Sequence, residues 1–172
     1  MRITEIITEL FSPNYKPSED NHWRLTANTR SDIFYRFDVK EKQYEVNLIN
    51  MLGAVNNQIY RVEFGLIGNY GLRSWNIANT GHSQKVFELV AYSLRHAVYT
   101  QDINGYYFTA DEPSRQKLYS ALARRMAAEL EWDLRPDLGQ WLDRTSAQCY
   151  LVIVPELAKI LDREREEEAN RS

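Results

Sequence analysis

The hydrophobic period of this sequence changes sharply near residue 83, and this change limits the folds that the chain can adopt. At 83–99, apolar residues recur at intervals of three and four, as on one side of an amphipathic helix. The stripe consists of Val86, Leu89, Val90, Ser93, Leu94, Ala97 and Val98. A strand-like run precedes it at 59–67, and a short apolar run follows at 106–110. The sequence therefore predicts a strand-helix-strand unit, whose right-handed crossover makes the two strands parallel neighbours.

Three strand-like segments precede the predicted helix. The segment 33–39 is rich in aromatic and β-branched residues, and 43–52 and 59–67 alternate between polar and apolar residues. The connections at 40–42 and 53–58 are short enough to join hairpins. We therefore expect an antiparallel meander of three strands.

The rest of the chain continues as alternating helices and strands. After the strand at 106–110 we expect a helix from Pro113, a short strand at 131–134, a linker containing Pro136 and Gly139, a strand at 150–154 and a helix from Pro155. The predicted order is β-β-β-α-β-α-β-β. This order belongs to the α/β class in the broad sense, an α+β mixed sheet with helices on its faces.

The length of 172 residues is typical of one domain, so we predict a single domain over 1–172. Prolines 13 and 17 interrupt any helix near the start, which indicates an irregular segment at 1–22. The charged stretch at 162–172 is expected to be a frayed tail.

Composition and charge argue against a membrane protein, a secreted protein and a nucleic-acid-binding protein. No run approaches the roughly 18 apolar residues of a membrane span, and the first residues lack the apolar stretch of a secretory leader, so we expect a cytoplasmic protein without a membrane partner. A formal net charge of −3 disfavours nucleic acid as a partner, because such binding depends on neutralising phosphates. The oligomeric state stays open.

The cysteine and the histidines suggest no reactive centre. The single cysteine, Cys149, has no partner for an intramolecular disulfide and stands in the apolar run 147–154, which favours a buried structural thiol. The three histidines, His22, His82 and His96, do not have the spacing of metal ligands. We therefore expect no metal.

The predicted order of elements at 33–154 resembles that of the GNAT acetyltransferase superfamily. Leu118 and Tyr119 stand where that family often carries an Asn-x-x-Ala-x-x-Leu-Tyr segment, although Glu112 and Arg115 occupy its Asn and Ala positions here. The stretch 108–119 also resembles a segment of uncharacterised phage-encoded proteins that share this fold. The resemblance implies a phage-encoded, GNAT-like protein.

The resemblance also implies a cofactor. GNAT enzymes bind the pyrophosphate of acetyl-CoA with backbone N–H groups of a Gln/Arg-x-x-Gly-x-Gly/Ala loop that leads into a helix, where unpaired donors and the helix dipole attract an anion. The corresponding segment here is 79–84, which has one glycine. The implied acetyl-CoA contacts are Thr80, Gly81, His82, Ser83 and Gln84.

Two catalytic residues follow from the same resemblance. Glu63 corresponds to the carboxylate base of the strand before the cofactor loop, and Tyr119 to the tyrosine that protonates the departing thiolate. Each has a simpler interpretation as well. Glu63 lies on the strand face opposite Val62 and Phe64, as a solvated side chain would, and Tyr119 flanks an apolar helix stripe, as a packing residue would.

The long connection at 68–81 suggests a second kind of function. It contains Tyr70, Arg73 and Trp75, residue types that are common in interfaces, and long connections in compact domains are often functional. A flap that caps the sheet through Trp75 is the structural alternative. Two functions therefore stay open: an acyl-CoA-dependent N-acyltransferase or its degenerate descendant, and a non-catalytic protein that binds and inhibits or redirects a host macromolecule in host takeover or anti-defence.

Overall fold

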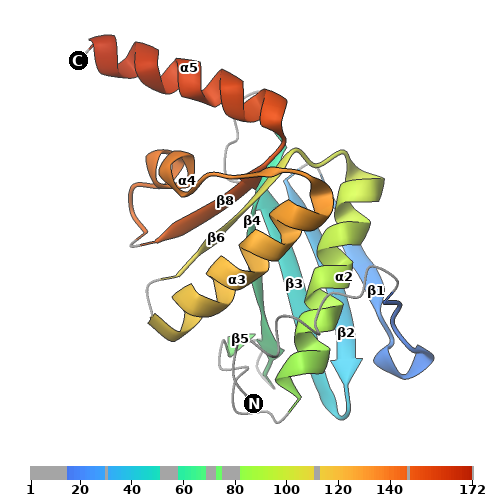
Figure 1. Ribbon diagram of the computed structural model, residues 1–172. Coiled ribbons are helices and arrows are strands. Elements are labelled where there is room, and N and C mark those ends of the chain that lie inside the picture. Colours follow the sequence, from blue (N-terminus) through green and yellow to red (C-terminus); the bar gives the residue numbers. More distant parts are fainter. Residues whose placement is uncertain are drawn as a thin grey trace. The chain divides into compact units, whose positions relative to one another are not determined.

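The computed structural model describes residues 15–29, 31–50, 58–68, 73–74, 82–110, 113–146 and 148–171 (Figure 1). The chain divides into two compact units. The first comprises Met1–Met51 and Val62–Asp102, and the second comprises Leu52–Arg61 and Ile103–Ser172. That the chain acts as a single domain stays a prediction.

The strands of the first unit, which includes β4 from Val62 onward, follow the sequence order. β1 (Arg24–Asn28), β2 (Asp32–Val39), β3 (Lys42–Asn50) and β4 (Ile59–Ile67) are neighbours in that order. The pairs β1–β2 and β2–β3 are antiparallel, and β5 (Arg73–Ser74) pairs antiparallel with the end of β4. The three predicted strands are thus present at β2, β3 and β4.

β1 was not predicted as a separate strand, and a 3-10 helix, η1 (Glu19–Asn21), precedes it. Four of the five β1 residues are exposed and its register shifts between Leu25 and Ala27. A short strand that buries neither face has no alternation of polar and apolar residues to reveal it.

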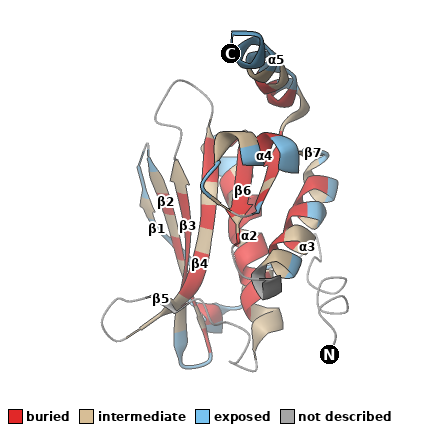
Figure 2. Cartoon of the chain, turned by 90° about the vertical axis from the view of Figure 1, so that its left-hand side faces the viewer, coloured by how far each residue is buried: buried red, intermediate tan, exposed pale blue. Residues whose placement is uncertain are grey.

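One face of these strands packs against α2 (Ser83–Gln101), as the apolar stripe predicted. The hydroxyl of Tyr35 in β2 lies 3.1 Å from His96 Nδ1, and the ring of Phe64 in β4 lies 5.8 Å from that of Phe87. Figure 2 shows buried residues along α2 and the strands of the sheet. The core of the first unit therefore lies between α2 and this face of the sheet.

The second unit contains the predicted parallel pair. The first residues of β4, Ile59–Arg61, pair parallel with β6 (Gly105–Thr109), and α2 lies between the two strands in the sequence. β6 pairs antiparallel with β8 (Cys149–Ile153), which pairs antiparallel with β7 (Asp133–Leu134). Parallel and antiparallel pairs make the sheet mixed, and the chain belongs to the α+β type.

Helices cover both faces of the second unit's strands. Tyr107 in β6 shares a cluster with Leu138 of α4 (Pro136–Leu142) and Leu157 of α5 (Pro155–Arg171). The next residue of β6, Phe108, points the opposite way and meets Tyr119 of α3 (Pro113–Leu130) at a ring separation of 5.9 Å. The alternating side chains of β6 therefore contact a different helix on each face.

The linker predicted around Pro136 and Gly139 is wrong in part, because this segment forms α4. Pro136 occupies the start of the helix, where its missing N–H costs no hydrogen bond. Gly139 lies against β8: a Cβ atom there would stand 3.0 Å from Cys149 Sγ. The glycine that suggested a linker serves close packing instead.

α5 continues through the charged segment to Arg171, so 162–171 is helical, and its fraying stays a prediction. Among the described helices, none combines the length and the apolar character that crossing a membrane requires.

Candidate functional site

The start of α2 carries the described part of the predicted cofactor site. Thr80 and Gly81 lie outside the described residues, and His82, Ser83 and Gln84 stand at the helix start. His82 is the N-cap residue and makes no capping hydrogen bond with its side chain. The first turn contains no acidic residue, so neither a side-chain cap from His82 nor a carboxylate of the turn itself offsets the positive end of the helix dipole.

A cation lies in the same turn. Lys85 Nζ is 4.4 Å from the centroid of the Tyr15 ring and 3.6 Å from Glu88 Oε2. Burial raises the pKa of Tyr15, and Lys85 opposes that rise, so the phenol stays neutral under the ammonium group. A helix start with a lysine and no acid in its first turn suits an anionic group such as a phosphate.

Glu63 projects from the sheet face opposite α2. Its neighbours Val62 and Phe64 are buried, and Phe64 contacts α2 through Phe87, whereas Glu63 is half-buried. Alternation along β4 therefore directs the Glu63 carboxylate to the other side of the sheet. The orientation expected from the sequence is confirmed, and the proposed role as a base stays untested.

The same face carries two buried polar side chains that sequence reasoning missed. Glu45 is 5% exposed and Asn47 is 1% exposed, although both alternate with apolar residues of β3 that face α2. Arg36 of β2 stands opposite Glu45, and its Nε donates to Glu45 Oε2 at 2.8 Å. Burying a carboxylate or an amide is costly unless it is hydrogen-bonded, and the contact with Arg36 meets this need for Glu45.

A signal for the Arg36–Glu45 pair was present in the sequence. The β2–β3 hairpin pairs Val39 with Lys42. Three positions further from the turn on each strand, Arg36 stands opposite Glu45. Opposite charges directly across an antiparallel pair indicate a salt bridge. The alternation of β3 does not reveal the burial of Glu45, because the pattern of a single strand does not show that both of its faces are covered.

Tyr119, the second predicted catalytic residue, is part of a core. Its side chain is 6% exposed and packs in α3 against Phe108 of β6. Tyr119 belongs to the second unit and Glu63 to the first. The burial agrees with the packing interpretation, and its role in catalysis stays untested.

The residues predicted to bind a partner are largely outside the described part of the chain. Tyr70 and Trp75 lie outside it, and of Arg73 the structure describes the backbone in β5, opposite Ile67 of β4. Their role at an interface stays a prediction.

A second polar cluster joins α2 to the segment before β1. Trp23 Nε1 donates to Ser93 Oγ at 2.9 Å, and the Trp23 ring stacks on Tyr35 at a centroid separation of 5.3 Å. Burial raises the pKa of Tyr35 and lowers the pKa of His96, so both side chains are neutral near pH 7. This cluster anchors the chain before β1 rather than forming a charged site.

The thiol of Cys149 is buried, as predicted, and burial together with the charge of Asp143 raises its pKa to about 12. A thiol that stays protonated is a poor nucleophile and a poor metal ligand. Within the described ranges, no three His, Cys, Asp or Glu side chains lie close enough together to hold a metal ion.

No protein-family model, curated protein or solved structure matches this chain. The likeness to GNAT enzymes consequently rests on the order of the elements and on the motif residues quoted above.

Proposed function

We propose that this chain is a GNAT-like protein that binds acyl-CoA at the start of α2 and transfers the acyl group to an amine, or that it descends from such an enzyme. One observation carries the proposal: the parallel pairing of β4 with β6, with α2 between them in the sequence, after the antiparallel hairpin of β2 and β3. This is the order that the resemblance implies. A phage origin rests on the resemblance of 108–119 alone.

The start of α2 fits the anionic part of this cofactor. Backbone N–H groups in the first turn of a helix have no intrahelical acceptors, His82 provides no side-chain cap, and Lys85 adds a positive charge. Thr80, Gly81, His82, Ser83 and Gln84 are the proposed contacts. Acyl-CoA would supply an acyl group activated as a thioester.

In this proposal, Glu63 accepts the proton that the acceptor amine loses, directly or through water. Glu45 and Asn47 lie on the same sheet face, within the same unit. Tyr119 donates a proton to the sulfur that leaves. Its burial against Phe108 makes it the weaker assignment of the two.

Calorimetric titration with acetyl-CoA tests the proposal. We expect micromolar binding, which corresponds to about −8 kcal/mol. Gly81→Val should abolish the binding heat, because a side chain there would obstruct the approach of backbone N–H groups to the pyrophosphate. Lys85→Gln should weaken binding, and Lys117→Gln, an exposed lysine at the start of α3, is the matched control that should not.

If the wild-type protein releases no heat with acetyl-CoA, the acyl-CoA proposal is wrong and the non-catalytic function takes its place. Capture of a host protein should then be lost with Arg73→Ala and Trp75→Ala. If Gly81→Val binds as well as wild type, the pyrophosphate site is not at the start of α2. Should binding occur, Tyr119→Phe should lower turnover without weakening binding.

A further inference from the structure

α5 is held to the second unit in two different ways along its length. Its buried side chains, Leu157, Ala158 and Leu161, all lie in the first two turns and join the apolar cluster around β8. From Asp162 to Arg171 no side chain of α5 is buried. The second half of the helix is therefore attached by something other than apolar burial.

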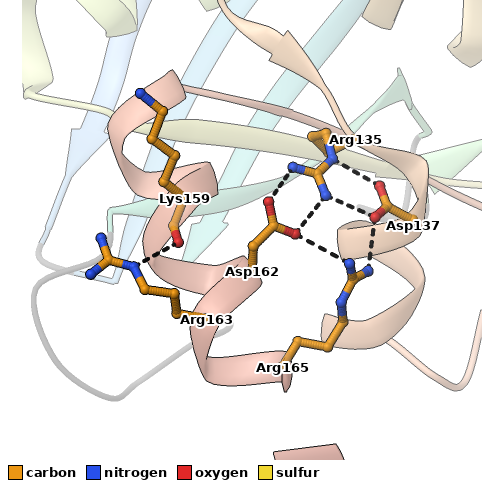
Figure 3. Close-up of polar contacts among 6 residues, drawn as sticks. All are labelled: Arg135, Asp137, Lys159, Asp162, Arg163 and Arg165. Atoms are coloured by element: carbon orange, nitrogen blue, oxygen red, sulfur yellow. Dashed lines mark hydrogen bonds and ion pairs between the residues drawn. The ribbon is translucent and has the colours of Figure 1, made fainter. Parts of the chain in front are cut away.

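Four charged side chains attach this half to the start of α4 (Figure 3). Arg135 donates to both carboxylate oxygens of Asp162 at 2.7 Å and to both oxygens of Asp137 at 2.8 and 2.9 Å. Arg165 donates to Asp137 at 2.8 Å and to Asp162 at 3.2 Å. Each cation thus contacts both anions, so the two positive and two negative charges compensate one another in a closed network.

A third contact lies one turn further along. Glu168 accepts from Trp141 Nε1 at 2.9 Å and from Arg144 at 3.0 Å. Asp162, Arg165 and Glu168 are spaced by three residues, so they lie along one side of α5. This side of the helix lies over α4 and over Trp141, which is itself only partly buried in the apolar cluster.

We propose that residues 162–171 form a strap over α4 that ion pairs hold in place at low ionic strength and that high ionic strength releases. Leu157 and Leu161 keep the first half of α5 in the core. When the ion pairs are released, the second half separates from α4 and frays, which uncovers Trp141. Dissolved salt weakens ion pairs between partly exposed groups and leaves apolar burial in place, so it acts on the second half alone.

Amide hydrogen exchange of the full chain tests the strap. Raising NaCl from about 0.05 M to about 1 M shortens the Debye length from roughly 14 to 3 Å, and we expect amides at 163–168 to exchange on the order of tenfold faster. Amides of β8 should keep their protection, and Trp141 fluorescence should change over the same salt range.

Asp162→Asn should speed exchange at 163–168 at low salt and remove most of its salt dependence. The matched control is Glu167→Gln, which removes one charge from the same helix but pairs with Arg171 and not with α4. That variant should behave as wild type.

Salt-independent exchange at 163–168 in the wild-type protein would overturn the proposal, as would equal exchange in Asp162→Asn and wild type at low salt. If Asp162→Asn also exposes β8, the variant unfolds the whole unit, and Glu168→Gln replaces it. The salt dependence of exchange in the wild-type protein tests the strap whether or not the Asp162→Asn variant folds.

Discussion

The two long helices α2 and α5 are alike in length but differ in what holds them. α2 has 19 residues, nine of them buried, and α5 has 17 residues, three of them buried. The buried residues of α2 extend from Val86 to Ala97, whereas those of α5 end at Leu161 and ion pairs continue in their place. Apolar burial stabilises a helix under all ordinary solution conditions, while exposed ion pairs contribute little and depend on salt and pH.

The largest effect should come from truncating the stripe of α2. Leu94 is fully buried, so Leu94→Ala should lower the free energy of unfolding by about 2–5 kcal/mol through lost burial and a residual cavity. Ile160→Ala in α5 is the control, because Ile160 is 45% exposed and its loss should cost no more than about 0.5 kcal/mol. Urea denaturation measures both. Equal costs for the two variants would remove the contrast between the helices.

A smaller effect should separate two buried tyrosines that face α2. Tyr35 bonds to His96, so Tyr35→Phe should lower the free energy of unfolding by about 1 kcal/mol. The hydroxyl of Tyr44 is buried and has no hydrogen-bond partner within the described part of the chain. Tyr44→Phe should therefore leave stability unchanged or raise it slightly. A loss in Tyr44→Phe as large as in Tyr35→Phe would show that the Tyr44 hydroxyl is bonded.

The smallest effect concerns pH. Burial lowers the pKa of His96, so the folded protein binds fewer protons than the unfolded chain, and stability should fall as the pH drops below about 6.5. Hydrogen bonds from Arg135 lower the pKa of Asp137 and of Asp162, so their contribution is present above about pH 4 and is lost as the pH falls further.

Two variants assign these pH ranges to the two helices. His96→Gln should flatten the loss of stability that begins near pH 6.5, and Asp162→Asn should reduce the loss below about pH 4. The measurement is the free energy of unfolding from urea titrations across pH 3–8. A change in the same pH range for both variants would contradict the assignment.

Much of the fold could be predicted from periodicity alone. The stripe of α2, the strands β2, β3 and β4, and the parallel pairing of β4 with β6 follow from patterns that extend over many residues. β1 and α4 could not be predicted in the same way. β1 buries almost nothing, and the seven-residue α4 begins with a proline and contains a glycine, both of which ordinarily indicate a break.

The candidate site was predictable only in part. The start of α2 and the orientation of Glu63 came from the sequence, since helix boundaries and strand alternation are local properties. The burial of Glu45 and Asn47 could not be predicted from the sequence, because it depends on what covers the second face of β3. For Tyr119 the order is reversed. Its position in a motif singled it out in the sequence, and the tertiary structure shows that it is buried against Phe108.

The sequence by itself determined the class of the fold, the parallel pair and the burial of Cys149, since each depends on the pattern of neighbouring side chains. Only the tertiary structure decided that α5 is attached by Arg135, Asp137, Asp162 and Arg165. Arg135 and Asp162 are 27 residues apart, and a charged helix end looks the same in sequence whether it is solvated or paired. The physical reason is that apolar periodicity acts locally, whereas an ion pair needs two distant segments to meet.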